Sequence, residues 1–363
     1  MKINRVLSVG RELDRFLAAR FMIFRAMAAL FMVSLLTLGM SGSRAIAAPP
    51  GTGSPPGDLE SDPLTDLAIT PATGSPEFRI LPHPGTRFGG QPASFNAWQV
   101  LGSRMDFALN YNQPAVDESL QRYLRDPGEV THALPRAELY LPYITERMVA
   151  NNLPPELALL PFMESAYNPS AQSPRGASGL WQITPATADR LGLTRNRWWD
   201  GRNDLIHSTD AAIDYLSYLN RRFDGDWLLS LAAYNSGEGT VSRAIAVNER
   251  KGEDTDFWAL DLPDQARAFV PKFLALAKFF QDSDKLPEAD PTRTASAHSL
   301  QALTLSRQIS LTRAAKLADI DYDLLKRLNP GIKLGVTPPQ GPHQLVLPQN
   351  AAQRLLAAIA AAQ

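Results

Sequence analysis

The sequence predicts a mainly α-helical protein with a small mixed α+β unit near its C-terminus. Through most of positions 135–282, apolar residues recur three and four positions apart, as in the run 210–223, and this is the period of a helix. No window shows sustained alternation of apolar and polar residues, which would indicate half-buried strands. Two short apolar runs, at 303–305 and 345–347, enclose two short helical patterns at 311–317 and 323–328. This order predicts a βααβ unit.

The bulk composition limits what the chain can be and bind. It has 363 residues, 44% of them hydrophobic, which suits two or three domains with buried cores. Lys plus Arg number 36 and Asp plus Glu 37, for a net charge of −1. This balance argues against a nucleic-acid partner, because phosphate binding needs a basic surface. The chain has no cysteine, which excludes disulfides, thiolate nucleophiles, cysteine-bound zinc and a lipoprotein anchor.

The N-terminal 48 residues have the pattern of an export segment. Basic residues, including Arg20 and Arg25, precede an apolar run at 26–40. Ala45-Ile46-Ala47 then fits a small-x-small cleavage site. The apolar run is shorter than the roughly 20 residues of a membrane-spanning helix, so a cleaved signal peptide is favoured over an uncleaved anchor that would associate the protein with a membrane. A start at Met22 would give a more ordinary signal peptide. Both interpretations place the mature protein outside the cytoplasm, in the periplasm or cell envelope.

Composition shifts divide the rest of the chain. Residues 49–90 are rich in Pro, Gly, Ser and Thr without periodicity, which predicts a disordered linker. A polar stretch with two prolines predicts a second linker. The domains that we expect are a signal peptide or anchor (1–48), a linker (49–90), a helical N-terminal extension (91–134), a helical catalytic domain (135–282), a linker (283–298), the βααβ unit (299–350) and an alanine-rich helical tail (351–363).

One carboxyl group is placed as a catalytic acid would be. Leu157, Leu160 and Glu164 fall on one face of a predicted helix, so the carboxyl lies on the apolar side near the helix's C-terminal end. Burial and the negative end of the helix dipole both raise a carboxyl pKa. A carboxylic acid that stays protonated near neutral pH can donate a proton to a glycosidic oxygen. Taken by itself, this helix favours the alternative of a surface glutamate that ends a helix.

Two further motifs carry groups suited to binding sugars. An indole offers a flat apolar face to a sugar ring, and amides can bind hydroxyl and N-acetyl groups. Glycines allow a bulky substrate to approach the backbone. These features occur in a loop rich in Ser, Pro and Gly, and where a helix meets a glycine turn: Gly179, Leu180, Trp181 and Gln182, and Tyr234 and Asn235.

In order and spacing these motifs resemble a known family. Glu164-Ser165, the segment 179–182 and Ala233-Tyr234-Asn235 resemble the soluble-lytic-transglycosylase-type catalytic domain, which is related to goose-type lysozyme. The text around them is most similar to the membrane-bound lytic murein transglycosylases. The resemblance covers roughly residues 130–280, with support from the segments 159–161, 198–202, 224–227 and 255–258.

The resemblance implies a reaction and a role for each motif. Glu164 would be the acid/base and Ser165 the neighbour that orients it. The segment 179–182 would line the sugar cleft, and Tyr234 and Asn235 would lie beside the acid. The family cleaves the bond between N-acetylmuramic acid and N-acetylglucosamine in peptidoglycan and forms a 1,6-anhydro end without water. No second carboxylate occurs in a comparable motif, whereas ordinary glycosidases need a pair. The alternatives are a hydrolytic muramidase of the same fold and a non-catalytic peptidoglycan-binding protein.

Several other residues carry expectations. Relatives usually have Tyr where this chain has Phe269, which puts a contact near the active site in doubt. Trp198 and Trp199 could stack on sugars, but packing is favoured for at least one of them. The five histidines match no metal-ligand spacing, so we expect no metal and no cofactor, and His207 is expected to be structural.

The C-terminal unit resembles a second known module. The segments 323–325 and 328–331 resemble a LysM module, which implies binding of glycan strands that contain N-acetylglucosamine. The alternative is a degenerate module kept for packing, because residues 332–344 depart from a compact LysM pattern. We therefore expect glycan strands of peptidoglycan as the partner, and a monomeric protein.

Overall fold

The computed structural model describes residues 101–102, 105, 107–281 and 300–361. The predicted signal peptide or anchor and the linkers 49–90 and 283–298 lie outside these residues. Within the described part of the chain, no helix is both long and apolar enough to cross a membrane.

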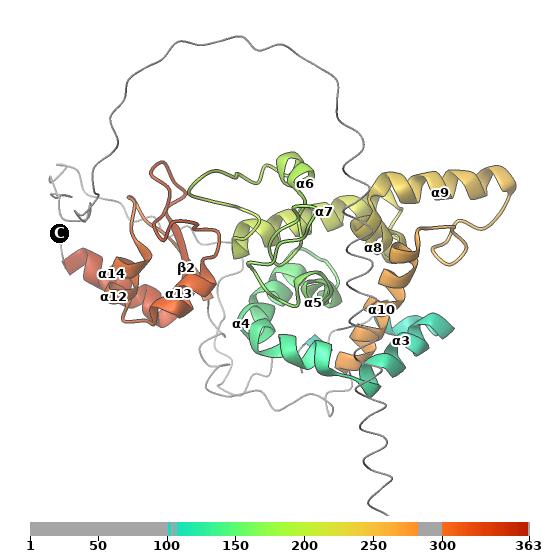
Figure 1. The fold of residues 1–363 in the computed structure, drawn as a ribbon, viewed down its shortest axis with the longest axis horizontal. Coiled ribbons are helices and arrows are strands. Elements are labelled where there is room, and N and C mark those ends of the chain that lie inside the picture. The colour runs from blue at the N-terminus through green and yellow to red at the C-terminus, as the bar shows by residue number, and fades with distance from the viewer. Residues whose placement is uncertain (1–100, 103–104, 106, 282–299, 362–363) are drawn as a thin grey trace, which may run out of the picture. The chain divides into compact units, whose positions relative to one another are not determined.

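The prediction of a mainly helical protein with a small βααβ module is confirmed. Short loops join most of the helices of the first domain (Figure 1), and several of these helices begin with an N-cap aspartate or threonine. In chain order its elements are η1 (Phe107–Asn110), α3 (Pro114–Arg125), α4 (Gly128–Ala150), η2 (Pro155–Leu159), α5 (Leu160–Ser165), α6 (Pro185–Arg190), α7 (Leu205–Arg222), α8 (Trp227–Ser236), α9 (Glu238–Lys251) and α10 (Asp264–Gln281).

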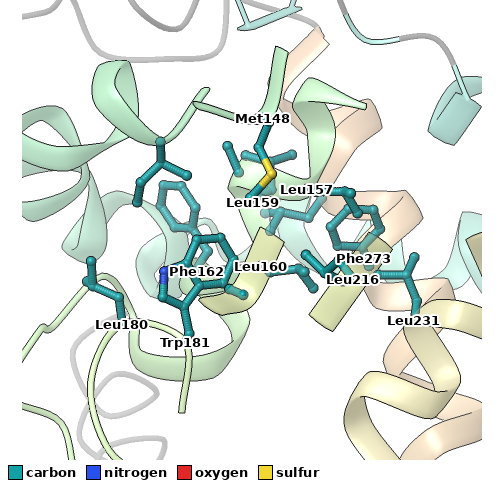
Figure 2. Close-up of a cluster of buried hydrophobic side chains, with 14 of the residues drawn as sticks. Met148, Leu157, Leu159, Leu160, Phe162, Leu180, Trp181, Leu216, Leu231 and Phe273 are labelled. Carbon is teal, nitrogen blue, oxygen red and sulfur yellow. The ribbon is translucent and has the colours of Figure 1, made fainter. Parts of the chain in front are cut away.

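The core of this domain lies between helices that are distant in sequence. Helix α10 runs beside α3 and α8, and α4 packs against η2 and α7 (Figure 1). Figure 2 shows a cluster of buried side chains, among them Leu160 of α5, Trp181 of the loop that follows it and Phe273 of α10. Fully burying one side chain of this kind contributes about 1.5–3 kcal/mol, so this cluster holds the segments around the site together.

The structure differs from the sequence prediction at two places in this domain. Helix α4 begins at Gly128 and has Pro135 and Pro142 in its interior, so the expected boundary between extension and catalytic domain at 134/135 falls inside one helix. Burial of Leu141 and Ile144 on the same helix offsets the hydrogen bonds that the prolines cannot make. A loop was expected only before residue 179, but the structure has loops through the whole of 166–204 apart from the short helix α6. Left-handed backbone at Ala166 and Gly179 prevents a continuous helix there.

The C-terminal module has the predicted strand–helix–helix–strand order. Strand β1 (Leu300–Thr304) pairs antiparallel with β2 (Gln344–Pro348), with Ala302 opposite Val346. Between them lie α12 (Leu311–Ala318) and α13 (Tyr322–Leu328). The expected separate tail is α14 (Gln349–Ala361), which packs against α12 and buries Leu355 in the module's own core. The tail is therefore part of the module, because its apolar face completes that core.

Candidate active site

Glu164 is the penultimate residue of α5. The same short helix buries Leu160 and Phe162, and Leu157 in the preceding η2 is fully buried, as the shared apolar face predicted. The Glu164 side chain is only partly exposed. The carboxyl group thus lies where a buried helix reaches the edge of the core.

A strained turn ends this helix directly after Glu164 and Ser165. Ala166 and Tyr167 both have left-handed backbone, with φ values of 48° and 57°, which costs about 1–2 kcal/mol for each residue. Burial of the Tyr167 ring against Phe162, at a centroid distance of 4.8 Å, offsets this cost. The Tyr167 hydroxyl also donates to the Ala158 carbonyl at 2.6 Å. The turn is therefore fixed, and it holds the acid at the helix end.

Burial makes Glu164 a proton donor near neutral pH. It raises the pKa of this carboxyl from 4.5 to about 7, because the charged form loses hydration. Among the described residues, no neighbouring cation or carboxylate contributes to this shift. The hydroxyl of Tyr234 is also affected: burial, and then the charge on Glu164, raise its pKa well above the ordinary value. Tyr234 therefore lies close to the acid.

The loop 179–182 joins the three predicted motifs through its backbone. The Ser165 hydroxyl donates to the Leu180 carbonyl at 2.9 Å, and the Tyr234 hydroxyl donates to the Trp181 carbonyl at 2.8 Å. Segments separated by 15 and 53 positions thus meet at two consecutive carbonyls. The structure therefore brings Ser165, the loop 179–182 and Tyr234 together beside Glu164.

The side chains of this loop do not lie as the sequence suggested. Leu180 and Trp181 are 1% and 0% exposed, and both point into the core cluster of Figure 2. The indole Nε1 donates to the Thr209 hydroxyl at 3.1 Å, so the ring packs in the core and offers no face to a sugar. A buried anchor of this kind fixes the loop, and only the backbone of Leu180 and Trp181 remains available at the site.

Two amide side chains complete the candidate site. Gln182 has left-handed backbone, and its Nε2 donates to the Gly179 carbonyl at 2.9 Å. Asn235 follows Tyr234 at the end of α8, and its buried Oδ1 accepts no hydrogen bond from the described residues. A buried acceptor without a donor costs free energy unless a ligand or water supplies one. Asn235 is thus suited to receive a hydroxyl or amide hydrogen from a substrate.

Arg202 and Asp200 support this loop, a role that was not predicted for either residue. Arg202 donates to Asp200 through Nε and a terminal nitrogen, at 3.0 and 2.7 Å. It also donates to the Gly176 carbonyl at 2.6 Å, just before the loop. Burial alone would raise the Asp200 pKa, but the hydrogen bonds and charge of Arg202 hold it below its ordinary value. The pair is thus an ion pair with most of its surface covered.

Three other residues that the sequence singled out, Phe269, Trp199 and His207, take part in core packing or contact a helix cap. Phe269 is buried in the main core. The ring of His207 contacts Asp204 at 2.6 Å, and Asp204 caps α7. Trp199 is 2% exposed, whereas Trp198 is half-buried. No cluster of His, Asp or Glu in the described ranges could hold a metal ion.

Comparison with known proteins assigns both domains. Residues 142–257 match the transglycosylase SLT domain family, and residues 299–362 match the LysM-like domain of lytic transglycosylase MltD. The chain is 37% identical over 266 residues to membrane-bound lytic murein transglycosylase D of Escherichia coli, covering 73% of this chain and 58% of that protein. A putative tributyltin chloride resistance protein from an Alteromonas strain is 50% identical over 122 residues, covering 34% of this chain and 59% of that protein.

A solved structure also matches part of the chain. It is the 70 kDa soluble lytic transglycosylase of Escherichia coli, with 25% identity and a TM-score of 0.30. The match covers 43% of this chain and 26% of that one.

The first domain of the chain therefore contains a match to the transglycosylase SLT domain family at residues 142–257, and its three motifs meet beside Glu164. The second is a LysM-like domain of the kind found in lytic transglycosylase MltD. The chain spans 58% of the length of the first relative.

Proposed function

We propose that this protein is a lytic transglycosylase that cleaves the β-1,4 bond between N-acetylmuramic acid and N-acetylglucosamine in peptidoglycan. The observation that carries the proposal is the arrangement around Glu164: burial raises its pKa to about 7, and the Ser165 and Tyr234 hydroxyls meet two consecutive loop carbonyls beside it. The sequence holds no second carboxylate in a comparable motif. Ordinary glycosidases place two carboxyl groups about 5–9.5 Å apart. A single acid suits a reaction in which the substrate supplies its own nucleophile.

In the proposed reaction Glu164 acts twice. It first donates its proton to the oxygen of the N-acetylglucosamine leaving group, and the bond from that oxygen to the muramyl anomeric carbon breaks. The carboxylate then takes the proton of the muramyl C6 hydroxyl, whose oxygen bonds to the anomeric carbon. Glu164 ends protonated, no water is consumed, and the product carries a 1,6-anhydro ring. Holding the hydroxyl close replaces the second carboxylate.

The neighbouring residues are assigned supporting roles. Ser165 and Tyr234 hold the loop at the Leu180 and Trp181 carbonyls, which fixes the backbone around the acid. Gln182 and Asn235 would bind the hydroxyl and N-acetyl groups of the glycan through their amides. We assign Gly179, Leu180 and Trp181 a backbone role in shaping the sugar site, because both larger side chains are buried.

The proposal includes a setting for the enzyme. The relative from Escherichia coli is named membrane-bound, and the sequence of the first 48 residues predicts export. We therefore propose that the protein acts on glycan strands in the periplasm or cell envelope, as a monomer and without a cofactor.

The mass of the products tests the proposed reaction. Purified full-length protein incubated with murein sacculi should release muropeptides whose muramyl ends are one water lighter than reducing ends, because the C6 oxygen replaces water as the nucleophile. The measurement is mass spectrometry before and after borohydride treatment, since borohydride reduces only open ends. Products with reducing ends would show a hydrolytic muramidase, and binding without release would show a non-catalytic peptidoglycan-binding protein.

The pH dependence of turnover should report the raised pKa of Glu164. The acid can donate only while protonated, so the rate should fall as pH rises through about 7, approaching tenfold per pH unit above it. The measurement is the initial rate on soluble glycan strands from pH 4 to 9, with tryptophan fluorescence to show that the protein stays folded. A fall centred near the ordinary carboxyl value of 4.5 would contradict this assignment.

A further inference from the structure

The LysM-like domain pairs its main chain with the loop that leads into α7. The Asp200 amide donates to the Gly331 carbonyl and the Lys333 amide donates to the Trp198 carbonyl, both at 2.9 Å. Between these bonds, Trp199 and Ile332 form an antiparallel bridge. The Lys333 ammonium adds a bond to the Asn196 carbonyl at 3.0 Å. The module therefore extends this loop as a second strand would.

At the same contact, each domain buries side chains in the core of the other. Trp199 belongs to the catalytic domain, yet it is buried in the module's core cluster beside Ile332. In return, Leu328 and Val346 of the module belong to the catalytic domain's core cluster. The Tyr140 hydroxyl of α4 donates to the Arg327 carbonyl at the end of α13, at 2.8 Å. The two domains share core residues and pair their backbones, so the contact between the segments 196–200 and 331–333 is a fixed joint. A binding module on a flexible tether would instead bury its apolar residues within itself.

The joint ends at the residue that holds the active-site loop. Asp200, whose amide is bound by Gly331, uses its carboxylate to hold the guanidinium of Arg202. Arg202 in turn binds the Gly176 carbonyl, and its own carbonyl lies against Gly179. The next carbonyls of that loop receive the Ser165 and Tyr234 hydroxyls. Each step is a hydrogen bond or a contact between largely buried groups.

We propose that the LysM-like domain is a positioning element of the active site, acting through Asp200 and Arg202 on the loop 179–182. The inference rests on the proposed function, and it adds a task for the module that needs no glycan contact. Asp200 and Arg202 touch no reacting atom and are positioning residues. When the module is displaced from the joint, the loop loosens and water reaches Glu164.

Gly331 offers a way to open the joint without changing the site. A side chain at this position would place its Cβ 3.1 Å from the Asp200 carbonyl oxygen and 3.2 Å from the Asp204 amide nitrogen. These are main-chain atoms, so the two backbones must move apart by a few tenths of an ångström to admit a Cβ. We expect the branched side chain of Gly331→Val to push them further apart. Leu334→Ala, three positions along the same loop, is the matched control because that side chain is 48% exposed.

The experiment compares hydrogen exchange and turnover in the full-length protein. In Gly331→Val, we expect the amides of Asp200, Lys333 and the segment 178–183 to exchange at least about tenfold faster, while α8 and α10 stay protected. The rate at saturating glycan should fall about tenfold with little change in KM. The alkaline limb of the pH profile should move to lower pH, because a hydrated Glu164 returns toward its ordinary pKa. Leu334→Ala should match wild type throughout.

A second variant separates the loop from the joint. Arg202→Lys keeps the charge but loses the two-pronged contact with Asp200, so it should loosen 178–183 while Asp200 and Lys333 stay protected. Whether or not Gly331→Val folds, Arg202→Lys tests the step from Asp200 and Arg202 to the loop, on which the inference depends. Wild-type exchange of 178–183 in either folded variant would overturn the inference. If wild-type protein releases no anhydro ends, the proposed function fails, and hydrogen exchange still decides the coupling.

Discussion

Replacing Glu164 by glutamine should lower the release of anhydro-muropeptides from murein sacculi by between about a hundredfold and ten-thousandfold, the range that general acid–base catalysis contributes. Glutamine keeps the shape of the side chain but has no proton to give to the leaving oxygen and cannot take one from the C6 hydroxyl. Because one group serves both steps, no second carboxylate can take over part of the reaction. The measurement is the rate of release at pH 6, where the wild-type acid is protonated.

Stability measurements separate lost chemistry from lost folding in this variant. A buried carboxyl whose pKa is raised from 4.5 to about 7 makes the folded state less stable as pH rises between these values, because the unfolded chain ionises first. Glutamine does not ionise, so at pH 8 Glu164→Gln should unfold at the same or a higher urea concentration than wild type. Glu249→Gln, at an exposed position of α9, is the matched control and should retain full turnover. Wild-type turnover in Glu164→Gln would remove this residue from the mechanism.

Helical periodicity predicted the elements whose apolar faces repeat in sequence. The run at 210–223 was expected to be helical and α7 covers Leu205–Arg222. The patterns at 311–317 and 323–328 became α12 and α13. In these segments local preference and burial agree, which makes prediction from sequence effective. The domain boundary expected at 134/135 falls inside α4, which begins at Gly128. Local sequence does not indicate a helix that continues through Pro135, whereas the burial of Leu141 and Ile144 stabilises it.

The loops that build the site were harder to predict, because their structure depends on distant partners. Trp181 follows a loop rich in Ser, Pro and Gly, which suggested a ring available to a sugar, but its indole Nε1 donates to the hydroxyl of Thr209, 28 positions later. Arg202 and Asp200 are separated by one residue, and no local pattern shows that the pair holds a loop some 25 positions earlier. The position of Glu164 at the edge of the core was predictable because Leu157 and Leu160, which the sequence placed on its apolar side, are both buried. The single helix expected there is the 3-10 helix η2 followed by α5.

Gly179→Ala should disrupt the same site from the backbone, with loss of stability as well as activity. Gly179 has φ of +85°, and an added Cβ would lie 1.9 Å from the Arg202 carbonyl oxygen, far inside contact distance. Left-handed backbone costs alanine about 1–2 kcal/mol, and overpacking adds about 1–3 kcal/mol. We therefore expect the free energy of unfolding, measured by urea titration, to fall by about 2–5 kcal/mol. Turnover of the remaining folded protein should drop at least about a hundredfold, because the carbonyls that hold Ser165 and Tyr234 must move.

Gly192→Ala shows how much of this loss comes from the close approach of two backbones. Gly192 also has left-handed backbone, with φ of +70°, but a Cβ there would meet nothing within 4 Å. This variant should lose only the backbone cost of about 1–2 kcal/mol and keep wild-type turnover and product masses. The difference between the two variants isolates the contact between Gly179 and Arg202. Equal stability and equal turnover in both would show that the loop tolerates separation from Arg202, and that its position does not govern the acid.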